Sequence, residues 1–361
     1  MKTPFHDFHV AAGARMVDFA GFRMPVQYKG IQVEHQAVRN NVGLFDLSHM
    51  GEFEVNGKDA EAFLQKTTTN NVADLDQPGK IQYSCLPTED GGIVDDLLVY
   101  RLEDRYFLVV NAANIKKDFD HLSKYVTGDV NLVDRSPEYG LLAIQGPNAE
   151  KLLAQLTDHD LNNMAYYTSA VAKIAGEDVL FSRTGYTGED GFELYIEPAH
   201  CGKLWNEINA VGSTMGMELV GLGARDTLRM EMKMPLYGND IDETTSPIEA
   251  GLSFIVDLTK DFIGKSIVEK HKQEKPSRRL VCLEAEGKGV PRQGFEIFAG
   301  DEAVGQVTSG TFSPSLKKPI ALGYVRRGKT KSGNELEIDI RGRRLPAVVV
   351  KPPFYKNASH K

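Results

Sequence analysis

Two adjacent carboxylates, Asp95 and Asp96, lie inside an otherwise apolar run, GGIVDDLLVY, at residues 91–100. We expect this run to be a β-strand, in which successive side chains point to opposite faces, so the two carboxylates face in opposite directions. Apolar neighbours on both faces indicate a strand covered on both sides, and burial raises the pKa of a carboxyl group unless donors or a cation stabilise its charge. At least one aspartate is therefore a candidate functional group.

A structural role is the alternative for each aspartate. A buried carboxylate often accepts backbone N–H groups and so fixes the conformation of a neighbouring loop. For a single aspartate in a strand this role is the more common one, because structural networks also perturb carboxylates. The surrounding residues must decide between the two interpretations.

Other catalytic motifs are missing from the chain. It has no nucleophile elbow, phosphate-binding loop or H-E-x-x-H motif, and its nine histidines are scattered. Cys85, Cys201 and Cys282 lie far apart without C-x-x-C spacing, so we expect reduced thiols and no structural zinc. We predict no metal site. A carboxylate-centred pocket with aromatic and amide side chains suits a flat heteroaromatic ligand.

The aspartates sit in the middle run of a predicted β-meander. Its runs are IQYSCL, GGIVDDLLVY and RYFLVVN, joined by short turns and followed by a helix at 115–125. A second unit with a similar order of strands and helices is expected to contain strands LLAIQG and GFELYIE, the hairpin AVAKIAGEDVLFSR, and helices at 147–155 and 201–211. Its loop RTGYTGEDGFE, residues 183–193, has three glycines, which either let backbone approach a ligand or simply make the turn.

The two ends of the chain differ from this middle part. Residues 1–50 contain two short alternating runs broken by Gly21 and Pro25, then a helix at 32–40. GLGARDTLRMEMKMP is expected to open a helix near Ala224. From about Arg278 short β-runs alternate with Gly and Pro, which indicates a small barrel or sandwich of its own.

Composition describes an ordinary soluble globular chain of two or three domains: 361 residues, 41% hydrophobic and 25% charged. With no apolar run of signal-peptide or membrane-spanning length, we predict a cytoplasmic protein that does not engage a membrane. The net charge is -8, but residues 271–361 hold 18 Lys and Arg against 9 Asp and Glu. Nucleic acid could bind such a basic region, although few stacking aromatics accompany it. An acidic protein or an anionic small molecule fits equally well.

Many ordered motifs make the chain resemble, from end to end, the T proteins of the glycine cleavage system, which are tetrahydrofolate-dependent aminomethyltransferases. The resemblance rests on TPFHDFHVAAGARMVDFAGFRMPVQY, FDLSHMGEFEV, GKIQYSCLPTEDGGIVDDLLVY, VVNAAN, AIQGPNA, RTGYTGEDGFE, GLGARDTLRME, DFIGKSIV and PPFYK. Pro87, in the loop before GGIVDD, is atypical of this family, and this difference affects only the expected shape of the loop.

The resemblance implies an α+β fold arranged as a three-domain cloverleaf around a central folate site. Two α/β sandwich-like units with antiparallel sheets would be joined by a C-terminal β-barrel. The first domain would combine residues 1–50 with 139–245, the second would be the inserted meander at 51–138, and 246–361 would hold a linker and the basic barrel.

The resemblance also implies roles for individual residues. Asp96 would be the catalytic carboxylate, close to N5 and N10 of the folate. The predicted folate-binding residues are Met50, Tyr83, Asn111, Tyr186, Glu193 and Arg225, with Glu193 bonding the aminopyrimidine edge. Taken alone, Tyr83 and Met50 could equally be core residues.

The reaction that the resemblance implies transfers a methylene from the aminomethyl-lipoyl arm of H protein to tetrahydrofolate, with release of ammonia. The predicted partners are therefore lipoylated H protein and folate, not nucleic acid. Another folate-dependent methyl or methylene transferase or demethylase of the family is an alternative, although the fused flavin domain of the dimethylglycine and sarcosine enzymes is not present. A non-enzymatic folate-binding protein is a second alternative, and DFIGKS in place of that group's K-G-C-Y-type motif disfavours it.

Overall fold

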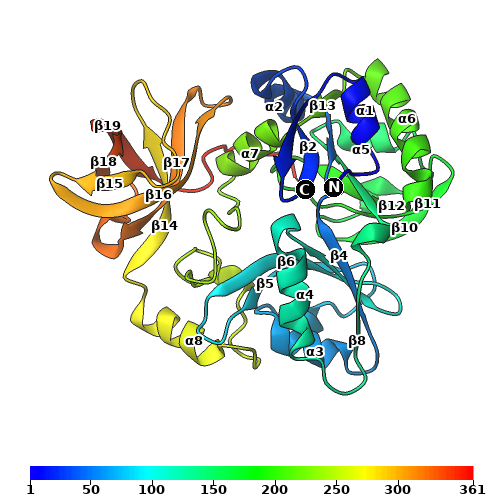
Figure 1. Ribbon diagram of the computed structural model, residues 1–361, viewed down its shortest axis with the longest axis horizontal. Helices are drawn as coiled ribbons and strands as arrows, with labels where there is room; N and C mark the ends of the chain where they lie inside the picture. The colour runs from blue at the N-terminus through cyan, green and yellow to red at the C-terminus, as the bar shows by residue number, and fades with distance from the viewer. Residues whose placement is uncertain (361) are drawn as a thin grey trace.

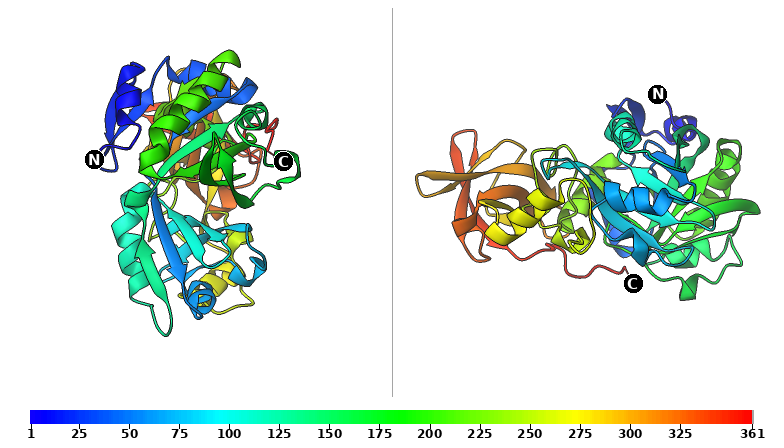
Figure 2. Two further views of the ribbon diagram at one scale, coloured as in Figure 1. Left: turned by 90° about the vertical axis from the view of Figure 1, so that its right-hand side faces the viewer. Right: turned by 90° about the horizontal axis from the view of Figure 1, so that it is seen from below.

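The computed structural model describes residues 1–360 and forms three bodies around a common centre (Figure 1). Two bodies are α+β units on separate sheets, and the third is a closed β-barrel. In Figure 2 the barrel forms one end of an elongated molecule, and the two α+β units pack together at the other. This arrangement confirms the α+β fold with a C-terminal barrel.

The first body is a six-stranded sheet with strand order β10-β11-β12-β9-β3-β13. Its strands are β3 (Gly43–Asp46), β9 (Gly140–Gln145), β10 (Ser169–Ile174), β11 (Glu177–Ser182), β12 (Gly191–Ile196) and β13 (Glu218–Val220). Its helices are α1 (His6–Ala11), α2 (Ile31–Asn40), α5 (Ala149–Leu153), α6 (Pro198–Thr214) and α7 (Leu222–Glu231), and β1 (Arg15–Phe19) and β2 (Phe22–Gln27) form a separate hairpin. Helix α6 begins at Pro198, whose missing N–H costs nothing at a first helical position.

The second body is a five-stranded antiparallel sheet with strand order β5-β6-β7-β4-β8. Its elements are β4 (Gly51–Asn56), α3 (Ala60–Thr67), β5 (Ile81–Pro87), β6 (Ile93–Arg101), β7 (Tyr106–Val110), α4 (Ile115–Ser123) and β8 (Asn131–Asp134). The predicted meander is thus confirmed as β5, β6 and β7. Strand β6 lies in its middle and carries both aspartates.

The third body is the barrel β14-β17-β16-β15-β18-β19. Its strands are β14 (Arg278–Ala285), β15 (Glu296–Ala299), β16 (Glu302–Ser313), β17 (Lys318–Arg326), β18 (Glu335–Ile340) and β19 (Arg343–Val350), preceded by helix α8 (Lys265–Glu274). Short 3-10 helices occur at Val72–Asp74, Ala112–Asn114, Ser136–Glu138, Leu161–Asn163, Ser253–Ile255 and Arg327–Lys329. Closure of the barrel leaves no sheet edge to pair with another chain.

A shared apolar cluster joins the two sheets. Phe45 and Leu141 of the first sheet pack in it with Tyr100 and Phe107 of the second. The hydroxyl of Tyr100 lies 2.8 Å from that of Tyr195, so the polar ends of these buried rings are also satisfied. The two sheets therefore form one continuous core, which fixes the walls of any site between them.

Several details differ from the sequence-based expectation. Strand β13 pairs with β3 in parallel, so the first sheet is not wholly antiparallel; β13 reaches β3 through the crossover helix α6. Pro25 lies inside β2 rather than breaking it, since this two-stranded hairpin has only edges. The three cysteines are free as expected and fully buried. The predicted domain boundaries remain a prediction.

Along residues 1–360, no helix combines the length and apolar character needed to cross a membrane.

Candidate active site

A cavity of about 780 Å³ lies where the three bodies meet. The second sheet contributes Tyr83 and Asp96 to its wall, the first sheet Glu193, and the barrel body Arg292 and Ser309. Its volume falls in the range of about 300–1,000 Å³ typical of small-molecule sites. The position between domains is also one that ligand sites favour.

All seven residues proposed from the sequence line this one cavity. They are Met50, Tyr83, Asp96, Asn111, Tyr186, Glu193 and Arg225. They come from segments up to 175 residues apart, between Met50 and Arg225, so the fold alone brings them together. Their individual roles remain predictions.

The two aspartates of β6 lie on opposite sides of the strand. Asp96 lines the cavity, where its Oδ2 accepts the hydroxyl of Tyr83 at 2.8 Å. Asp95 is fully buried and accepts Asn114 Nδ2 at 2.7 Å, on the side of α4. The alternation of a β-strand thus separates one carboxylate for the cavity from one for the protein interior.

Asn111, at the end of β7, bonds to both aspartates. Its Nδ2 donates to Asp95 Oδ1 at 2.8 Å and to Asp96 Oδ1 at 2.9 Å. Its backbone N–H donates to Asp95 Oδ2 at 3.0 Å. Asp95 therefore fixes the end of β7, and Asn111 in turn orients Asp96 toward the cavity.

Burial and the neighbouring charge of Asp95 raise the pKa of Asp96 to about 7, against the opposing effect of bonds from Tyr83 and Asn111. Burial also raises the pKa of Tyr83 well above its usual value, so its hydroxyl keeps its proton and serves as a donor to Asp96.

A third carboxyl group, Asp118, lies behind this pair on α4. Burial and the charge of Asp95 raise the pKa of Asp118 to about 11, so it is neutral at neutral pH. Neither side-chain oxygen of Asp118 has a hydrogen-bond partner among residues 1–360, and the neutral acid spares the site a third negative charge. The sequence analysis missed Asp118; its signal is the four-residue spacing from Asn114, which places both on one face of a helix.

The opposite wall of the cavity comes from the 183–193 loop and α7. Glu193 is buried, and one oxygen accepts the hydroxyl of Thr184. Burial raises the pKa of Glu193, although the Thr184 bond and the nearby Arg225 charge oppose the shift. The guanidinium of Arg225 lies 5.3 Å from the ring centroid of Tyr186, within the range of a cation–π contact.

Glycine is required where this loop passes the end of β9. A Cβ on Gly185 would lie 2.0 Å from Gln145 Oε1. The same Gln145 side chain accepts Thr187 Oγ1 at 2.8 Å and donates to the carbonyl of Thr184 at 3.0 Å. The glycine-rich loop is thus a closely packed cavity wall, rather than only a hairpin turn.

Two further polar cavity residues were not proposed as site residues from the sequence. His49 was assigned only to a turn; its Nε2 accepts Arg225 Nη1 at 3.0 Å, and burial together with that charge lowers its pKa to about 3, so it stays neutral. Arg229 donates to Asp240 Oδ2 at 2.6 Å and so carries a compensated charge at the cavity wall. The pairing of His49 with Arg225 leaves no local pattern in the sequence because the two residues lie 176 positions apart, whereas Arg229 also donates to Asp226 Oδ1, three residues before it, at 2.9 Å.

The arrangement suits a flat, polar heteroaromatic ligand. Tyr83, Tyr186 and Met50 offer apolar surfaces, and Glu193 offers a carboxylate that can accept two parallel N–H bonds. Asp96 supplies a second carboxylate, which can stabilise a nearby positive charge or hold a proton. The site therefore supports chemistry on a nitrogen-containing ring.

Comparison with known proteins gives consistent results over the whole chain. The family model described as the GCVT N-terminal domain matches residues 5–260, and the glycine cleavage T-protein C-terminal barrel domain matches residues 278–356. An aminomethyltransferase of Bacteroides fragilis is 52% identical over 98% of this chain and 99% of its own length. One from Anoxybacillus flavithermus is 51% identical over 98% of each chain.

A solved structure agrees with this similarity. The glycine cleavage system aminomethyltransferase T from Bartonella henselae matches with a TM-score of 0.93 and 35% identity, over 100% of this chain and 99% of that one.

Proposed function

Because the chain belongs to the glycine cleavage T-protein family, we propose that its central cavity binds tetrahydrofolate and receives an aminomethyl group from lipoylated H protein. Family membership makes the chain an aminomethyltransferase of the glycine cleavage system. The observation that carries the folate proposal is the meeting of all seven predicted residues at one cavity of suitable size. The predicted cytoplasmic location stays a prediction.

The reaction forms two carbon–nitrogen bonds and breaks two bonds to the same carbon. In the donor, the methylene joins the lipoyl sulfur to an amino group. Bonds from this carbon to N5 and N10 of tetrahydrofolate replace its bonds to sulfur and nitrogen. The two hydrogens lost from N5 and N10 leave with ammonia and with the lipoyl thiol, and no oxidant or reductant is needed.

Asp96 is the residue that we assign to charge stabilisation in this reaction. Positive charge develops on the transferred carbon and on the attacking nitrogen, and a carboxylate held by Tyr83 and Asn111 needs no reorganisation to stabilise it. A pKa near 7 also allows Asp96 to accept a proton released during closure on N10.

The remaining lining residues would hold the folate in position. Glu193 would accept the amino and ring N–H groups of the pterin, with Tyr83, Tyr186 and Met50 against the ring. Arg225 would stabilise the charge of Glu193, since burial makes that charge costly. Holding N5 against the incoming carbon supplies the proximity part of the rate enhancement.

The test is to incubate the protein with aminomethyl-loaded H protein and tetrahydrofolate and to measure ammonia and methylenetetrahydrofolate. We expect both products in equal amounts, and none above background without tetrahydrofolate. Loaded free lipoamide in place of H protein separates the chemistry from carrier recognition. Turnover with another methyl donor but not with the loaded carrier would favour the alternative transferase function.

A further inference from the structure

The chain continues beyond the barrel as a tail, residues 351–360, that returns to the first α+β body. It leaves β19 at Val350, and Figure 2 shows it running from the barrel along the molecule to the C-terminus beside that body. Phe354 is buried against Met230 of α7 and the barrel residue Tyr324. The tail is therefore anchored at its start and reaches a surface far from its own barrel.

The end of the tail bonds to three successive residues of the 183–193 loop. Ser359 N–H donates to Glu189 Oε2 at 3.1 Å, and the Ser359 hydroxyl donates to the same oxygen. The Asp190 N–H donates to Ser359 Oγ at 3.1 Å. His360 Nδ1 donates to the Gly188 carbonyl at 2.7 Å. Tail and loop thus form a continuous hydrogen-bonded contact.

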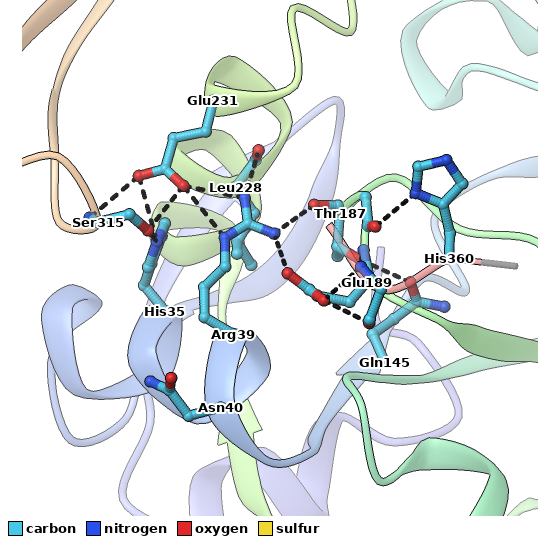
Figure 3. A network of polar contacts seen from close by, with 12 residues as sticks. His35, Arg39, Asn40, Gln145, Thr187, Glu189, Leu228, Glu231, Ser315 and His360 are labelled. Atoms are coloured by element: carbon cyan, nitrogen blue, oxygen red, sulfur yellow. Dashed lines mark hydrogen bonds and ion pairs between the residues drawn. The ribbon is translucent and has the colours of Figure 1, made fainter. Parts of the chain in front are cut away.

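Glu189 is the central acceptor of this contact, and its side chain is only 1% exposed. Its other oxygen, Oε1, accepts Arg39 Nη1 at 2.7 Å, and the same nitrogen donates to the Thr187 carbonyl. A buried carboxylate is stable only when both of its oxygens accept hydrogen bonds. Arg39 donates to one oxygen of Glu189, and Ser359 donates to the other. Figure 3 shows Arg39 between the carboxylates of Glu189 and Glu231.

The Arg39 network links the loop to the rest of the molecule. Arg39 Nη2 lies 3.0 Å from Glu231 Oε2, and Glu231 also accepts Ser315 Oγ of the barrel body at 2.8 Å. The Tyr355 ring covers the Arg39 guanidinium at 4.2 Å. Both ends of the tail therefore act on one network, which the 183–193 loop shares.

The loop segment that the tail holds lies directly beside cavity residues. Gly188 has φ +82° and packs so closely on Met232 that a Cβ would lie 2.6 Å from its side chain. Met232 lines the cavity, as do Tyr186 and Glu193, which flank residues 188–190 in sequence. A shift of the tail-bound residues would therefore move the cavity wall.

We propose that the C-terminal tail positions the 183–193 loop for folate binding, with Ser359 as its main positioning residue. This rests on the proposed function, because the ligand in question is tetrahydrofolate. The tail contributes Pro352 to the cavity lining, but through Ser359 it holds Glu189 and Asp190, which lie outside that lining. Its loss therefore weakens ligand binding more than it slows the chemical step.

Ser359→Ala tests the proposal, with Ser359→Thr as the variant that keeps the hydroxyl and exposed Asn357→Ala as the matched tail control. For each we would measure the Kd for tetrahydrofolate, KM, kcat with loaded carrier, and the thermal midpoint. We expect Ser359→Ala, which loses the bonds of the hydroxyl to Glu189 and Asp190, to raise Kd and KM by about 3- to 10-fold, with kcat within about twofold. Ser359→Thr restores the Kd, and Asn357→Ala leaves it unchanged.

An unchanged Kd in folded Ser359→Ala overturns the proposal, even if the thermal midpoint falls, because the tail would then be only a structural brace. Should that variant not fold, amide exchange of the wild-type protein decides: coupling is reciprocal, so tetrahydrofolate must slow exchange at Ser359 and Asp190. Unchanged exchange there would refute the tail's role. Failure of the wild type to bind tetrahydrofolate would instead refute the proposed function.

Discussion

At the scale of single residues, the site separates two neighbouring carboxylates by their surroundings. Asp95 accepts Asn111 and Asn114 in a closed interior, whereas Asp96 faces the cavity and bonds to Tyr83. Adjacent positions in a strand make this separation automatic, because they point to opposite faces. The strand thus supplies a fixed support and a reactive group from two consecutive residues.

The raised pKa of Asp96 predicts opposite pH trends for activity and stability. With a pKa of about 7 in the folded protein against an ordinary 3.8, the folded state binds more protons between these values. The free energy of unfolding therefore falls as pH rises through this window, and kcat/KM rises as the carboxylate forms near pH 7.

Denaturant unfolding of wild type and Asp96→Asn from pH 4.5 to 8.5 checks this prediction, because the variant lacks the titrating group. We expect Asp96→Asn to gain stability relative to wild type as pH rises. A difference between the two proteins that stays constant over this range would contradict a raised pKa at Asp96.

At the scale of elements, β6 is placed by close backbone packing at its start. Gly92 precedes the strand, and a Cβ there would lie 1.8 Å from the carbonyl oxygen of Glu243. The N–H of Ile93 donates to the Asp242 carbonyl at 3.1 Å, so the strand and the 236–252 segment approach backbone to backbone. Tyr237 of that segment lines the cavity.

Gly92→Ala should therefore destabilise the protein and disturb the site. Overpacking typically costs about 1 to 3 kcal/mol, and backbone on the other side leaves no flexible side chain to give way. Gly328→Ala is the matched control, since its Cβ meets nothing within 4 Å. Equal unfolding free energies for the two variants would show that the close approach at Gly92 is unimportant.

The sequence could predict the meander and the barrel because alternating apolar runs and turn residues are local signals. It could not predict the parallel pairing of β13 with β3, which depends on the crossover through α6. Resemblance identified the cavity residues; pattern alone left Asp95 and Asp96 equivalent. Asp118 and His49 were not proposed as site residues because their neighbours Asp95 and Arg225 come close only in the tertiary structure.

At the scale of the whole molecule, the charge is divided between the barrel end and the rest. Residues 271–361 carry a net charge of +9, although the whole chain carries a net charge of -8. This basic region predicts electrostatic attraction to an acidic carrier protein. Part of this charge is already paired, since Lys318 lies 2.8 Å from Glu284 and Arg326 lies 2.6 Å from Glu302. The exposed Lys317 and Arg327 are thus the better candidates for steering.

Charge reversal of Lys317 and Arg327 should slow association with loaded H protein and flatten its salt dependence, while kcat at saturating carrier stays unchanged. Lys58→Glu, an exposed reversal on the second α+β body, is the control. Association rates from stopped flow at several salt concentrations provide the measurement. An unchanged rate and salt slope in the double variant would leave the basic barrel surface without a role in docking.

The central claim is that Asp96, and not Asp95, carries the reaction. Asp95→Asn should retain methylene transfer while losing about 1 to 3 kcal/mol of stability, because the amide cannot accept all the hydrogen bonds that Asn111 and Asn114 donate to the buried carboxylate. Unfolding of this variant is therefore followed alongside its activity.

The most direct measurement is the turnover of methylene transfer by folded Asp96→Asn with saturating loaded H protein and tetrahydrofolate. The substitution keeps the shape of the side chain and removes its charge. We expect kcat to fall by a factor equivalent to about 2.7 to 4 kcal/mol, with a smaller effect on folate affinity. Near-normal turnover by Asp96→Asn, together with loss of transfer in well-folded Asp95→Asn, would place the catalytic carboxylate on the other face of β6.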